Sequence, residues 1–84
     1  MTLVRRLAQF VQDMRTLGLE FNVNFALSKG TANITFMLNN PDLKSANTIE
    51  AALREEFETD NSKIISNYLG QSVEMTIKTE TEQL

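Results

Sequence analysis

The stretch FNVNFALSKGTANITFML, residues 21–38, contains two runs in which apolar and polar side chains alternate. A period of two is typical of a β-strand that has one face in the core and the other in water. Between the two runs, Gly30 lies in a Ser28–Thr31 segment suited to a tight turn. The stretch therefore predicts a β-hairpin, and its register is fixed because a slip of one residue would expose the large apolar side chains.

Helical spacing precedes this hairpin. Between Thr2 and Leu17, apolar residues recur at steps of three and four positions, which predicts an amphipathic helix. Thr2 is placed as the N-cap of that helix, and Gly18 is placed to end it in a left-handed conformation.

A second helix is predicted after the hairpin, with a buried stripe formed by Ile49, Ala52, Leu53 and Phe57. Its start lies anywhere between Pro41 and Thr48. An early start would use Asn40 as the N-cap and Pro41 in the first helical position. A late start would use Asn47 as the N-cap, with Glu50 three residues further on.

The remaining third of the chain is predicted to form a short helix and a strand. Capping side chains at residues 59–62, followed by an apolar cluster within residues 64–69, predict a kink and a short helix that ends at Gly70. Alternation over residues 72–79 predicts a third strand, and residues 79–84 are expected to form a frayed tail.

The sequence thus predicts one small α+β domain over residues 1–84, in the order α-β-β-α-(short α)-β. Every main element is apolar on one side only. The expected architecture is therefore a two-layer sandwich, with the helices on one face of a three-stranded sheet.

Composition narrows the classes of function. The 84 residues carry 8 basic and 11 acidic side chains, a net charge of −3, and include no Cys and no His. The absence of a disulfide framework favours a cytoplasmic protein, and no stretch reaches the length of a transmembrane helix, so no membrane partner is expected. Without His, Cys or a glycine-rich phosphate loop, the sequence predicts no catalytic residues, no metal site and no cofactor. A small-ligand site or enzyme formed only in a dimer stays open as an alternative.

Polar residues on the outward side of the predicted sheet are the first candidate site. Amides and hydroxyls offer adaptable hydrogen bonds to a protein partner, although antiparallel sheets commonly leave one face in water. Asn is disfavoured in strands, so three Asn residues on one face favour a role in binding. The candidate partner-binding residues are Asn22, Asn24, Asn33, Thr35, Met37 and Thr76.

A second candidate is a weakly basic face on the first helix, formed by Arg5, Arg6 and Arg15. The predicted element order resembles that of type II KH-like domains, a fold that includes RNA-binding modules. In the KH family, a GxxG loop between two helices clamps the nucleic-acid backbone, and the matching stretch here, residues 58–61, is Glu-Thr-Asp-Asn. The resemblance therefore implies a nucleic-acid-associated domain that lacks the GxxG loop.

The sequence as a whole predicts a small acidic binding or adaptor protein that acts through protein–protein contacts. Its size, its acidity and its lack of catalytic groups suit a phage or mobile-element inhibitor or accessory factor. A nucleic-acid-associated domain is the alternative, though overall acidity argues against it. Because an open sheet has two unpaired edges, a homodimer formed through the sheet is a further hypothesis.

Overall fold

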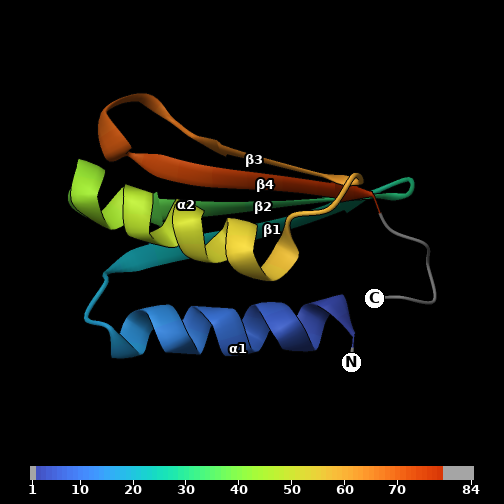
Figure 1. The fold of residues 1–84 in the computed structure, drawn as a ribbon, viewed down its shortest axis with the longest axis horizontal. Coiled ribbons are helices and arrows are strands. Elements are labelled where there is room, and N and C mark those ends of the chain that lie inside the picture. Colours follow the sequence, from blue (N-terminus) through green and yellow to red (C-terminus); the bar gives the residue numbers. More distant parts are fainter. Residues whose placement is uncertain (1, 79–84) are drawn as a thin grey trace.

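The computed structural model describes residues 2–78, with the exception of the Tyr68 side chain (Figure 1). The elements follow in the order α1 (Leu3–Thr16), β1 (Phe21–Ser28), β2 (Thr31–Leu38), α2 (Leu43–Phe57), β3 (Ser62–Ser66), the 3-10 turn η1 (Tyr68–Gly70) and β4 (Ser72–Lys78). The strands form one antiparallel sheet in the order β1-β2-β4-β3. The predicted α+β class is confirmed, while the predicted tail at residues 79–84 lies outside the described residues.

Helix α1 begins and ends where the sequence predicts. The hydroxyl of Thr2 accepts a hydrogen bond from the Arg5 N–H at 3.3 Å and caps the first turn. At the other end, Gly18 has a φ of 90°, and its N–H donates to the Arg15 carbonyl. The Leu19 N–H donates to the Met14 carbonyl, which completes a Schellman motif and turns the chain into β1.

The predicted hairpin is also confirmed. Strands β1 and β2 pair over their full length, from Phe21 opposite Leu38 to Ser28 opposite Thr31. Gly30 provides the positive φ in the turn, at 68°. Strand β4 then pairs with β2 rather than with β1, so β1 remains at an edge of the sheet.

The sheet has a fourth strand where the sequence predicts a short helix, so the three-stranded sheet is wrong. Residues Ser62–Ser66 form β3, and Ile64 lies opposite Met75 of β4, where both side chains are buried. The capping side chains of Thr59 and Ser62 close a turn before β3 instead of starting a helix, since the Thr59 N–H donates to the Ser62 hydroxyl. Only the 3-10 turn η1 is helical in this region.

The strand at Ser62–Ser66 also removes the resemblance to type II KH-like domains. Residues 58–61 connect α2 to a strand, and the described order is α-β-β-α-β-β. The expected loop between two helices is therefore absent from the described part of the chain.

Helix α2 begins at Leu43, inside the predicted interval, but neither proposed cap is used. Asp42 is the N-cap, and its carboxylate accepts hydrogen bonds from the Lys44 N–H at 3.1 Å and from the Ser45 hydroxyl at 2.6 Å. Both bonds lower the pKa of Asp42, that from Ser45 most strongly. The caps predicted at Asn40 and at Asn47 are wrong, because a carboxylate directly before the first turn also interacts favourably with the helix dipole.

The core lies between the helices and one face of the sheet (Figure 1). Phe10 of α1 makes edge-to-face contacts with Phe36 of β2 and Phe57 of α2, with ring centroids 5.5 and 5.9 Å apart. Phe36 makes a similar contact with Phe21 of β1 at 5.6 Å. These aromatic contacts join α1 to the sheet and α2 to α1 within the predicted two-layer arrangement. Neither helix among the described residues is long and apolar enough to cross a membrane.

Candidate functional site

The sheet face opposite the helices carries the polar residues predicted as a partner-binding site. The register brings them together in cross-strand pairs: Asn22 with Met37, Asn24 with Thr35, and Asn33 with Thr76. Strand β3 adds Lys63 and Ile65 to this face, where neither was predicted because both were expected to lie in a short helix. The structure thus joins all six predicted residues on one surface.

Several of these polar side chains already have partners within the protein. The Thr76 hydroxyl donates to the Asn33 side-chain carbonyl at 2.8 Å, and the Asn22 amide lies 3.5 Å from the Asn39 side-chain oxygen. Such a face can remain in water without cost, as antiparallel sheets commonly do. These internal hydrogen bonds explain how Asn22 and Asn33 are tolerated in the strands, and they do not require a partner protein.

Two of the three residues of the predicted basic face on α1 make contacts within the protein. The Arg6 guanidinium lies 4.6 Å from the centroid of the Phe57 ring and pairs with the Glu56 carboxylate at 3.6 Å. The Arg15 guanidinium lies 4.7 Å from the centroid of the Phe21 ring. Both side chains thus cover core aromatic rings, and only Arg5 has no such contact to an aromatic ring or carboxylate in the described residues.

An apolar groove lies between α1 and the edge of the sheet. We call it the β1 groove. It has a volume of about 250 Å³ and is lined by Val4, Leu7, Ala8, Val11, Val23, Phe25 and Ile34. Val23 and Phe25 face the helix layer, yet 37% and 43% of their surfaces remain exposed, and Leu27 beyond them is 53% exposed. Large apolar side chains exposed in a row usually mark a contact surface.

The edge of β1 beside this groove has unpaired backbone groups. The Asn39 N–H donates to the Glu20 carbonyl at 3.1 Å, which sets the phase of the β1–β2 ladder. Hydrogen-bonded pairs alternate along an antiparallel ladder, so the even-numbered residues of β1 bond to β2. The N–H and C=O groups of the odd-numbered residues point to the open edge; these residues are Phe21, Val23, Phe25 and Leu27.

The two edges of the sheet differ in their protection. Strand β3 has five residues, carries Lys63, and its Ile64 carbonyl accepts a hydrogen bond from the Arg54 guanidinium at 2.8 Å. Strand β1 has eight residues and contains neither a charged residue nor Pro. Charged side chains, short length and Pro are the usual means of preventing edge pairing, and β1 has none of them.

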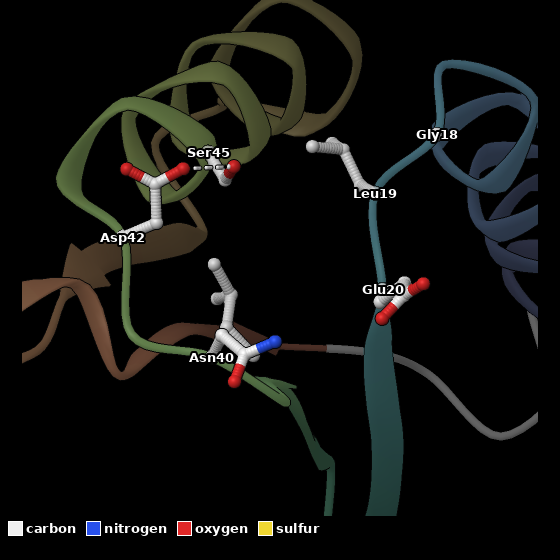
Figure 2. A pocket seen from close by; sticks show the side chains of 7 residues that line it. Gly18, Leu19, Glu20, Asn40, Asp42 and Ser45 are labelled. Atoms are coloured by element: carbon white, nitrogen blue, oxygen red, sulfur yellow. Dashed lines mark hydrogen bonds between the residues drawn. The ribbon is translucent and has the colours of Figure 1, made fainter.

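A second hollow lies between the α1–β1 connection and the start of α2 (Figure 2). It has a volume of about 210 Å³, and Glu20, Asn40 and Asp42 provide its main polar groups. Figure 2 shows the Asp42 carboxylate bonded to Ser45, and Leu19 extends into the space from the opposite side. The Asp42 carboxylate is already used as the cap of α2, so it is not free to bind a ligand in this hollow.

No group of three or more residues suited to holding a metal ion occurs within residues 2–78. A scan against protein-family models finds no match to the chain, and searches of curated proteins and of solved structures find none either.

Proposed function

We propose that the chain is a small protein-binding module, an adaptor that acts in the cytoplasm and binds its partner along the edge of β1. The observation that carries this proposal is the combination of an uncharged, unprotected strand edge with an apolar groove directly beside it. In strand addition, backbone hydrogen bonds supply affinity and pockets for alternate side chains supply specificity. Here the β1 edge supplies the backbone hydrogen-bonding groups, and the β1 groove supplies the pocket for side chains of the partner.

The outer sheet face is the weaker candidate for the binding surface. Its exposed apolar residues, Met37 and Ile65, lie on strands that are not neighbours, and Asn33 and Thr76 satisfy one another. The β1 groove instead places its apolar side chains next to the N–H and C=O groups of the β1 edge, which are not bonded to another of the described strands.

Nucleic-acid binding has less support than protein binding. Arg6 and Arg15 hold their guanidinium groups over aromatic rings of the core, and the net charge is −3. Few phosphates can be neutralised by the remaining basic groups of α1.

Affinity capture from the native host with a tagged chain tests the proposal. The informative variant is Leu27→Lys, which places a charge beside the β1 groove at a residue that is already half exposed. The matched control is Ala26→Lys, on the same strand but on the outer face. We expect the wild type and Ala26→Lys to capture the same protein and Leu27→Lys to lose it; equal capture by all three would refute binding at this edge.

A further inference from the structure

We infer that the occupant of the β1 groove is a second copy of this chain, joined by antiparallel β1–β1 pairing about a two-fold axis at Asn24. This inference rests on the proposed function and names the partner for the same site. The result would be a homodimer with one continuous sheet across both copies.

The backbone geometry of β1 restricts the ways in which two copies can pair. The open N–H and C=O groups belong to the odd-numbered residues, which also carry the apolar side chains. Odd-numbered residues must therefore lie opposite odd-numbered residues, because any other register would leave these groups unpaired and mix the two faces. An axis at Asn24 places Phe21 opposite Leu27 of the second copy and Val23 opposite its Phe25, so all four open residues are used.

The charges at the ends of β1 favour the same arrangement. Glu20 precedes the uncharged strand, and Lys29 follows it. In antiparallel pairing about Asn24, Glu20 lies opposite Ser28 of the second copy and therefore next to its Lys29. Opposite charges thus meet at both ends of the shared strand pair, whereas parallel pairing in register would bring Lys29 beside Lys29.

The exposed apolar side chains on the helix side complete the interface. Val4 of α1 is 49% exposed, and Val23, Phe25 and Leu27 remain exposed beside it. Two-fold pairing brings the β1 grooves of both copies together on one face, so that each covers the other. A surface of this kind measures on the order of a few hundred Å² per copy, which is small for a stable dimer, so we expect dissociation constants in the micromolar range.

Disulfide trapping tests the register directly, because the wild-type chain contains no Cys. At the proposed axis, Asn24 meets its own copy as a non-hydrogen-bonded pair with a Cα separation of about 4.5 Å. That distance lies within the range that a disulfide bridges, roughly 4.4–6.8 Å. Under mild oxidation, we expect Asn24→Cys to form a covalent dimer rapidly. The control Lys63→Cys, which is exposed on the opposite edge strand, should remain mostly monomeric.

Sedimentation equilibrium tests the pairing of the edges without a cross-link. From micromolar to millimolar concentration, the wild type should shift from a 9.5 kDa species to twice that mass. Val23→Pro removes an N–H that points to the open edge and is not used by β2, so the fold is retained and pairing is blocked. Val23→Ala is the matched control, since it loses apolar surface but keeps the N–H, and circular dichroism checks that both variants fold. We expect dimers for Val23→Ala and monomers for Val23→Pro.

Three outcomes would overturn the inference: a monomeric wild type at millimolar concentration, equal trapping of Asn24→Cys and Lys63→Cys, or an unchanged dimer in Val23→Pro. In each case, the host capture experiment separates the inference from the proposed function. If capture still depends on Leu27, the β1 edge binds a different protein and only the homodimer is refuted. If capture does not depend on Leu27, both fail.

Discussion

Gly18 and Gly70 provide a matched pair of substitutions with clearly different expected effects. Both have a positive φ, 90° for Gly18 and 73° for Gly70. A Cβ atom added at Gly18 would meet nothing within 4 Å, whereas one at Gly70 would lie 2.6 Å from the Asp42 carbonyl carbon and 2.7 Å from the Leu43 nitrogen. The two Ala variants therefore share the conformational penalty and differ in the steric one.

The conformational penalty for Ala at a left-handed position is about 1 kcal/mol, which is the full loss expected for Gly18→Ala. Gly70→Ala must also displace the backbone that enters α2, and overpacking of this kind adds about 2 kcal/mol. The expected loss for Gly70→Ala is therefore about 3 kcal/mol, a large share of the roughly 4–13 kcal/mol available to a chain of this length.

Urea denaturation monitored by circular dichroism measures both losses, provided that the slope of the transition stays constant. In thermal unfolding, the Gly18→Ala variant should lower the melting temperature by about 4–8 °C, and Gly70→Ala should lower it by clearly more. If the two variants lose the same free energy of unfolding, the close packing of η1 against the start of α2 is wrong.

Three further experiments test the core, the helix cap and the charge network. Leu53→Ala, at a fully buried residue, should lower the free energy of unfolding by about 2–5 kcal/mol in urea denaturation. Asp42→Ala should lower it by about 0.5–2 kcal/mol through loss of the α2 cap, while Asn40→Ala should leave it unchanged, and equal losses would mean that the cap is misassigned. The hydrogen bond from the Ser66 hydroxyl, together with the Arg54 guanidinium, lowers the pKa of Glu50 from its ordinary value of 4.5. This contribution is present above pH 4.5 and is lost as the pH falls through the lowered pKa, so unfolding measured from pH 6 to pH 3 should depend less steeply on pH in Glu50→Gln than in the wild type.

The elements that could be predicted from the sequence are those that local signals determine. The hairpin follows from the alternation on both sides of Gly30, and α1 follows from its stripe and its two caps. These features require only residues close in sequence, so no knowledge of the tertiary fold is needed.

Strand β3 could not be predicted with the same security, because its local pattern fits two structures. The neighbouring residues Ile64 and Ile65 suit one face of a short helix, and the capping side chains before them strengthen that interpretation. In the sheet, Ile64 is buried opposite Met75 while Ile65 is exposed on the outer face. The available signal for a strand was the pair of adjacent β-branched residues. Pairing with β4 decides between strand and helix, and β4 lies later in the chain.

The β1 groove was missed for a reason linked to the fourth strand. The alternation places Val23, Phe25 and Leu27 on the helix side, and the structure agrees. Alternation indicates which face of the sheet a side chain lies on, but not how much of that side chain stays exposed. Helix α2 packs against β3 and β4, which lie on the far side of the sheet from β1. Only α1 is left to cover β1. The apolar residues of β1 remain partly exposed because β4 pairs with β2 and leaves β1 at the edge of the sheet.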